Sequence, residues 1–111
     1  MATIIEYEVK KYAATLFSGT NLRFNQRIFL YRADGNFAAE VYFYEEGVTM
    51  PPPSGPAASG SITLTYRSNR FDSVMDILRN EKPVYVYYDE GGGNGGIATH
   101  VEPVGEGENK S

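Results

Sequence analysis

Apolar and polar positions alternate along most of the chain, and this period of two predicts strands rather than helices. In residues 3–17 the apolar positions first fall on odd numbers, from Ile5 to Val9. After Lys10-Lys11 they fall on even numbers, beginning with Tyr12. A slip of one residue moves side chains to the other face, so the pattern predicts a β-bulge or a sharp bend in this segment.

The next two segments predict a β-hairpin. Residues 22–33 and 37–45 both alternate, and Asp34-Gly35 between them is a strong signal for a two-residue turn. The alternation places one set of apolar side chains toward a core: Ile28, Leu30, Ala39, Val41 and Phe43.

The second half of the chain predicts a strand, a helix and two further strands. Residues 61–67 alternate, whereas residues 69–82 carry apolar side chains at the spacing of one helix face. That helical stripe consists of Phe71, Val74, Met75 and Leu78, and Pro83 ends it. Residues 84–88 and 97–104 predict the last two strands, separated by a glycine-rich turn.

This order, β-β-β-β-α-β-β, predicts an α+β fold. A mainly antiparallel sheet of about six strands would bury the apolar stripe of the single helix against one of its faces. The alternative is a small β-barrel with the helix plugging one end. We expect one domain over residues 1–104, with a mobile proline-rich loop at 47–60 and a flexible acidic tail at 105–111.

Composition narrows the chemistry. The apolar content of 41% and charged content of 22% are typical of a globular domain. The absence of cysteine excludes disulfides and thiolate metal sites, and a single histidine excludes a histidine-rich site, so we expect no cofactor and no metal. The chain shows neither a secretory leader nor an apolar run long enough for a membrane span, which predicts a cytoplasmic protein without membrane contact.

The net charge of −4 is concentrated at the C-terminal end. Residues 89–111 contain five acids against Lys110, which accounts for the whole excess. Negative charge repels phosphate backbones, so this tail disfavours a nucleic-acid partner.

No group of residues forms a recognisable catalytic motif. His100 could pair with Glu102 on the same strand face, but no nucleophile accompanies them. The segment Gly91–Gly96 lacks the lysine of a phosphate-binding loop and connects two strands, which favours a flexible turn. We therefore favour a non-enzymatic protein with no catalytic residues.

Outward-facing aromatic residues are the feature that points to binding. The chain has nine tyrosines and six phenylalanines, and the alternation places several of them on the sheet face opposite the helix. Tyrosine is enriched in recognition surfaces, although cross-strand aromatic pairs also stabilise a sheet without any partner. The candidate binding residues are Arg27, Phe29, Tyr31, Tyr42, Tyr44, Tyr85 and Tyr87.

Three functions are compatible with these patterns. The first is a small interaction domain that uses the tyrosine-rich face and self-associates as a homodimer, burying that face or pairing edge strands. The second is a single-stranded nucleic-acid binding module that stacks bases on the same face. The third is a small enzyme or ligand-binding protein with a pocket between sheet and helix.

Overall fold

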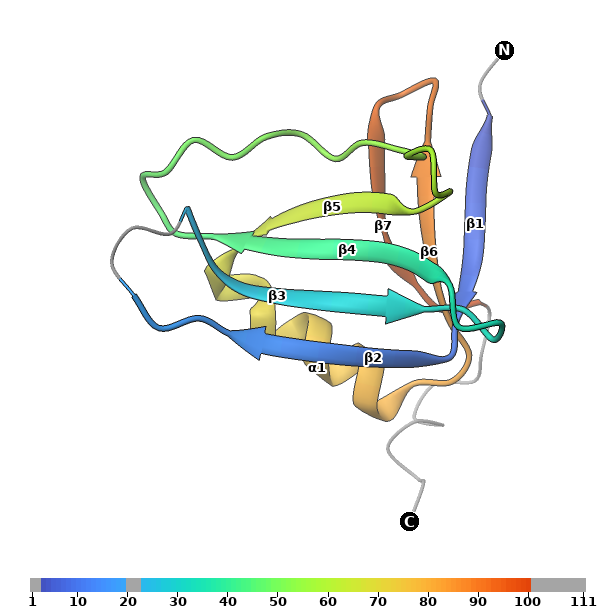
Figure 1. The fold of residues 1–111 in the computed structure, drawn as a ribbon, viewed down its shortest axis with the longest axis horizontal. Coiled ribbons are helices and arrows are strands. Elements are labelled where there is room, and N and C mark those ends of the chain that lie inside the picture. Colours follow the sequence, from blue (N-terminus) through green and yellow to red (C-terminus); the bar gives the residue numbers. More distant parts are fainter. Residues whose placement is uncertain (1–2, 20–22, 101–111) are drawn as a thin grey trace.

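The computed structural model describes residues 3–19 and 23–100, and it confirms the α+β class. Its described elements are seven strands, one short 3-10 helix and one α-helix (Figure 1). They are β1 (Ile4–Val9), β2 (Lys11–Leu16), β3 (Phe24–Tyr31), β4 (Phe37–Tyr44), β5 (Ile62–Arg67), the 3-10 helix (Ser68–Arg70), α1 (Phe71–Asn80), β6 (Val84–Asp89) and β7 (Asn94–Ala98).

The strands form two sheets instead of the single sheet expected. One has the order β2-β3-β4-β5 and the other the order β1-β6-β7. In Figure 1 the strands of the smaller sheet run across those of the larger one, behind one end of it. The described strands form open sheets and no closed barrel, so the barrel alternative is wrong.

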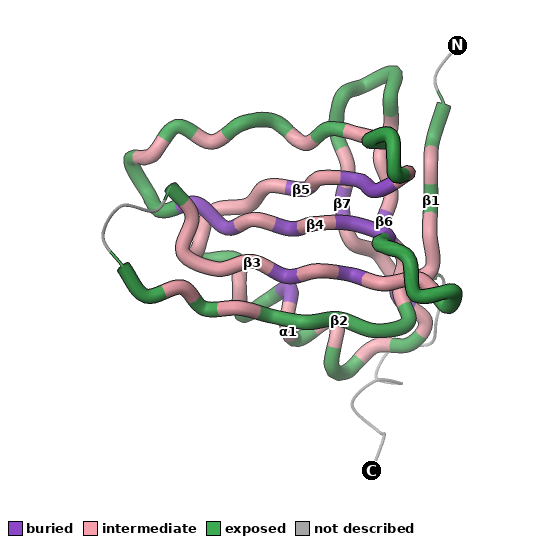
Figure 2. The backbone as a smooth tube through the Cα atoms, viewed as in Figure 1, coloured by how far each residue is buried: buried purple, intermediate pink, exposed green. Residues whose placement is uncertain are grey.

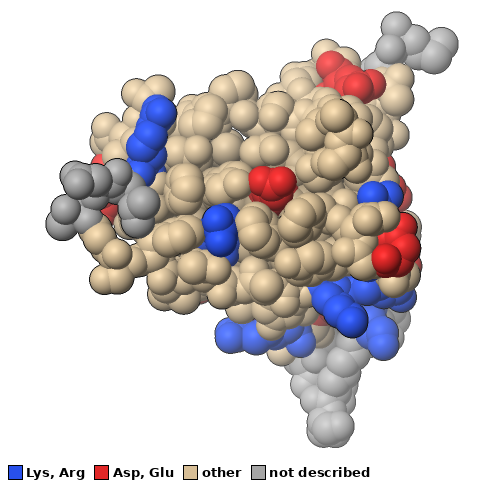
Figure 3. All heavy atoms as spheres, viewed as in Figure 1, with Lys and Arg blue, Asp and Glu red and all other residues tan. Residues whose placement is uncertain are grey.

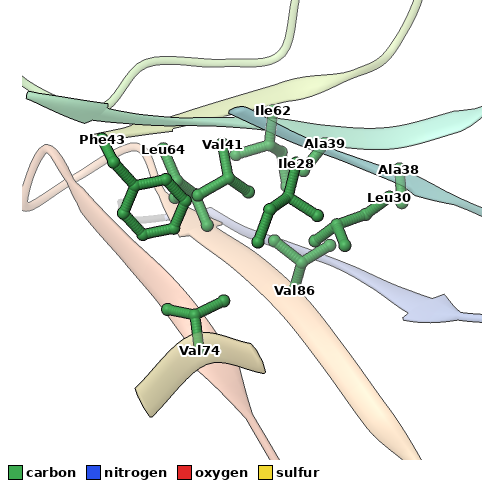
Figure 4. Close-up of a cluster of buried hydrophobic side chains, with 10 residues drawn as sticks. All are labelled: Ile28, Leu30, Ala38, Ala39, Val41, Phe43, Ile62, Leu64, Val74 and Val86. Carbon is green, nitrogen blue, oxygen red and sulfur yellow. The ribbon is translucent and has the colours of Figure 1, made fainter. Parts of the chain in front are cut away.

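The core lies on the inner face of the four-stranded sheet. That face is covered by the smaller sheet, through Val86, and by α1, through Val74 (Figures 2 and 4). The remaining side chains of the helical stripe are partly buried and pack against the same cluster, as predicted. The buried cluster consists of Ile28, Leu30, Ala38, Ala39, Val41, Phe43, Ile62, Leu64, Val74 and Val86.

The parity slip near the N-terminus marks a corner between the two sheets. Strand β1 pairs with β6, and β2, which starts directly after Lys10, pairs with β3. The Lys10 amide donates to the Tyr31 carbonyl at 2.8 Å, while Lys11 occupies the register position opposite Tyr31. Lys10 and Lys11 therefore both lie opposite Tyr31. This is the arrangement of a β-bulge, and it bends the chain between β1 and β2.

The proline-rich segment returns the chain for a parallel strand. Strand β5 pairs with β4 in parallel, which requires a long connection and explains why this pair is not a hairpin. Ser54 exchanges backbone hydrogen bonds of 2.9 and 2.8 Å with Thr63, so the segment follows the outer edge of β5. The Arg67 guanidinium also donates to the carbonyls of Glu45 and Val48, at 2.7 Å each.

The C-terminal strand begins earlier than expected. Strand β7 already starts at Asn94, so the second half of the glycine-rich segment is strand and only its first half is turn. The expected strand continuation beyond His100 and the acidic tail lie outside the described residues. No helix among the described residues is long and apolar enough to cross a membrane.

Candidate functional site

The outer face of the four-stranded sheet carries a continuous layer of aromatic side chains. The residues come from β3 and β4 and from the end of β2, and α1 lies on the opposite side of the sheet (Figure 1). We call this layer the aromatic face. It consists of Phe17, Phe24, Phe29, Tyr31, Phe37, Tyr42 and Tyr44, with Arg27 and Glu40 among them.

Neighbouring rings on this face contact one another in two groups. Phe24 lies at the centre of the first, with ring centroids 4.8 Å from Tyr42, 5.4 Å from Phe17 and 5.9 Å from Tyr44. In the second, the Phe37 ring lies 5.1 Å from that of Phe29 and 5.2 Å from that of Tyr31. These distances and tilts are those of favourable aromatic pairs.

Arg27 connects the two groups of rings. Its guanidinium carbon lies 4.3 Å from the centre of the Phe29 ring and 5.1 Å from that of Phe17. Such cation–π contacts contribute about 0.5–1 kcal/mol each at partly exposed sites. The Nε atom of Arg27 is buried and has no hydrogen-bond partner. The guanidinium is therefore held in place by rings rather than by a carboxylate.

Glu40 supplies the negative charge of the face and binds a tyrosine. The Tyr42 hydroxyl donates a hydrogen bond of 2.7 Å to Oε1 of Glu40. Burial, together with this hydrogen bond and the charge of Glu40, raises the pKa of Tyr42 to about 12. The phenol therefore remains a neutral donor at any physiological pH.

The aromatic face is otherwise nearly free of charge. Figure 3 views the molecule from the side of this face: most of the surface is uncharged, one acidic and one basic patch lie near its middle, and the other charged side chains lie toward the margins. Phe37, at one end of the face, is 36% exposed. Contiguous apolar surfaces of sufficient size mark interaction sites.

The structure brings the predicted β3 and β4 residues together but not those of β6. Tyr85 and Tyr87 belong to the other sheet, where they lie opposite Glu8 and Glu6 of β1. They could not join the aromatic face because the corner at Lys10 and the long connection build two sheets. The candidate site is therefore restricted to Arg27, Phe29, Tyr31, Tyr42 and Tyr44 together with neighbours that alternation had missed.

The missed aromatic residues are explained by two bulges. The register between β3 and β4 shifts between Phe24 and Gln26 and again between Leu30 and Tyr31. Each shift turns the next side chain to the other face, so Phe24 and Phe37 point outward although simple alternation places them inward. Phe17 could have been identified, since it continues the outward parity of β2.

His100 lies outside this surface, in a different environment from the expected one. Its ring stacks on Tyr85 with centroids 3.7 Å apart, and its Nε2 atom lies 3.5 Å from a carboxylate oxygen of Glu6. The predicted partner, Glu102, lies outside the described residues. Among the described residues, no serine or threonine side chain forms a hydrogen bond with His100.

A second candidate is a hollow of about 590 Å³ at the corner between the sheets. It lies between the β1–β2 corner and the last turn of α1, and its walls include Lys10, Lys11, Arg79 and Lys82. The acids Glu8 and Glu81 also line it, and Lys10 forms an ion pair with Glu8 at 3.1 Å. The lining has four cations but no histidine, serine or threonine, so it cannot contain a hydroxyl nucleophile activated by a histidine of the serine–histidine kind.

Neither known families nor metal chemistry identify the site. Within the described residues, no group of three or more His, Cys, Asp or Glu side chains is placed to hold a metal ion. Comparisons with family models, with curated proteins and with solved structures found no match. The functional inference therefore depends on the geometry of the aromatic face.

Proposed function

We propose that the protein is a non-enzymatic interaction domain that binds another macromolecule through the aromatic face and that also self-associates. The observation that carries this proposal is a contiguous aromatic layer on the outer sheet face, whose rings are at least partly exposed apart from Tyr44, which is buried. The layer is supported from behind by a complete core, since α1 and the smaller sheet pack on the opposite side of the same strands. Folding of the core alone therefore does not require seven aromatic rings on the outer face.

The chemistry of the face suits protein recognition. Tyrosine and arginine are among the residues that contribute most to the binding energy of interfaces. Where the rings and the guanidinium already contact one another, these side chains lose less conformational entropy on binding. Arg27 offers a guanidinium that the Phe17 and Phe29 rings already orient. A fitting partner presents apolar side chains around one hydrogen-bond acceptor.

A random peptide library displayed on phage is a suitable probe for this surface. Peptides selected on the wild-type protein would be measured against Tyr42→Lys, on the aromatic face, and Tyr85→Lys, a matched change on the other sheet. We expect the selected peptides to lose about tenfold or more in affinity for Tyr42→Lys, as for a central interface residue, and to keep it for Tyr85→Lys. Equal binding to all three proteins would show that the face is not the recognition surface.

A single-stranded nucleic acid is the second candidate partner. One observation favours it: Arg27 and Phe29 form a stacked pair on an exposed sheet face, the arrangement on which bases stack. Glu40 and the acidic C-terminal end weigh against it. Salt-dependent binding of an oligothymidylate that Arg27→Gln weakens would favour this candidate, and absence of binding at low salt would exclude it.

A further inference from the structure

Within residues 3–19 and 23–100, strand β2 is the edge of the larger sheet that remains open. The other edge, β5, is closed by the proline-rich segment through Ser54. No described strand pairs with β2 on its outer side, and only Lys11, at its start, is charged. By comparison, the edge strand β1 carries Glu6 and Glu8, and charges of this kind discourage edge pairing.

The backbone groups of alternate β2 residues point away from the sheet. The Phe17 amide donates to the Asn25 carbonyl at 2.9 Å, which fixes the odd-numbered residues as those bonded to β3. In an antiparallel ladder the intervening residues direct their N–H and C=O groups to the other side. The outward groups of β2 are those of Tyr12, Ala14 and Leu16.

The side chains of these same residues are exposed as well. Leu16 is 70% exposed and Tyr12 is 37% exposed, and both project from the inner face, beside the core. The last turn of α1 reaches the Tyr12 end of β2, where Leu78 and Tyr12 line the same hollow. Among the described residues, the Leu16 end has no such contact with α1 in this hollow.

We propose that β2 pairs antiparallel with β2 of a second copy of this chain, with the two-fold axis between the two Ala14 residues. In this register Ala14 exchanges two hydrogen bonds with Ala14 of the second copy, and Tyr12 lies opposite Leu16. Lys11 lies opposite Phe17, so no like charges meet across the axis. This register also overlaps the whole strand, whereas any shift leaves outward backbone groups unpaired at both ends.

The pairing covers what each copy leaves exposed. The Leu16 end of one β2 lies beside the Tyr12 end of the other, where the last turn of α1 provides the missing apolar neighbour. A two-fold axis perpendicular to the sheet keeps both aromatic faces on one side, so the dimer presents them as one surface. This β2–β2 pairing would be the structural basis of the self-association in the proposed function, and the inference rests on that proposal.

Sedimentation equilibrium from micromolar to millimolar concentration tests the interface. We expect the wild type to dimerise and two edge variants, Ala14→Pro and Leu16→Lys, to weaken the dimer by about tenfold or more, because one removes the central hydrogen bonds and the other adds charge to the edge. Proline is tolerated at Ala14 because that N–H does not bond to β3. The matched control is Ile4→Lys, which changes an aliphatic side chain that is 64% exposed on the other sheet, and it should dimerise as the wild type does.

Cross-linking tests the register. The chain has no cysteine, so each thiol is an introduced one. Residues paired across the axis have Cα atoms about 5.5 Å apart, within disulfide range, and Ala14→Cys should form a covalent dimer under mild oxidation. Leu16→Cys is the control, because its two copies would be about 14 Å apart along the strands.

The outcomes separate this inference from the proposed function. A wild type that stays monomeric at all concentrations overturns the edge pairing, as does a dimer that both edge variants leave unchanged. If Tyr42→Lys abolishes the dimer and the edge variants do not, the aromatic face is the dimer interface and the edge pairing is wrong. Loss of peptide binding in Tyr42→Lys with an intact dimer supports both surfaces.

Discussion

Phe43 offers the most direct test of how this core is built. It is fully buried, its ring lies 5.1 Å from that of Phe71 on α1, and it stacks on Tyr66 of β5 at 5.8 Å. Burial of a phenylalanine side chain contributes about 1.5–3 kcal/mol, and each ring pair about 0.5–1.5 kcal/mol more. Phe43→Ala should therefore lower the free energy of unfolding by about 3–5 kcal/mol, the range found for such core truncations.

Urea unfolding followed by circular dichroism measures this loss. Phe37→Ala is the matched control, because it changes the same residue type in the same strand at a position that is 36% exposed. We expect the control to cost about 1 kcal/mol, with an unchanged dependence on urea in both variants. A loss below about 1 kcal/mol for Phe43→Ala would show that α1 does not pack on this sheet as described.

Three further changes test separate parts of the structure. Gly95→Ala should destabilise the protein by about 1–3 kcal/mol in urea unfolding, because a Cβ atom there would lie 2.5 Å from the Tyr87 carbonyl oxygen. Gly96→Ala is the control and should lower the stability less, because its Cβ atom would contact only the Tyr87 ring. Because the pKa of Tyr42 is raised in the folded protein, the tyrosine ionises first in the unfolded chain, above pH 10. The free energy of unfolding should therefore fall as the pH rises from 10 toward 12, as measured by urea midpoints across that window. The fall should be smaller in Tyr42→Phe. Arg67→Ala should speed cleavage of residues 47–60 by a broad-specificity protease, since it removes the hydrogen bonds to Glu45 and Val48; an unchanged cleavage rate would contradict this role.

The elements with local signals could be predicted from the sequence. The hairpin of β3 and β4 follows from alternation on either side of Asp34-Gly35, and α1 follows from a helical stripe that Pro83 ends. Both signals lie within a few residues of the structure that they specify. The alternation and the helical stripe also identify most of their core side chains, namely Ile28, Leu30, Ala39, Val41, Phe43 and Val74, but not Ala38, which is buried at the second bulge.

The features that depend on pairing between distant strands could not be predicted in this way. The parity slip after Lys10 indicated a bend, but only the pairing partners reveal that β1 and β2 belong to different sheets. The parallel pairing of β4 and β5 depends on where the proline-rich segment returns, and its composition does not specify that path. The candidate site changed most, because it was inferred by assuming a single sheet.

The corner at Lys10 links the candidate binding surface to the open edge. The corner places β1 in the smaller sheet and leaves β2 as the edge strand of the larger one. The aromatic face therefore ends at an open edge rather than at another strand. On the outer face of the sheet, β2 presents Lys11 at its start and then Ala13 and Thr15, which are small and lie opposite Phe29 and Arg27. Small residues at the seam would let the aromatic faces of two paired copies meet with little interruption. In the proposed dimer, the same bend that divides the predicted tyrosines between two sheets would therefore give a larger surface than one chain can present.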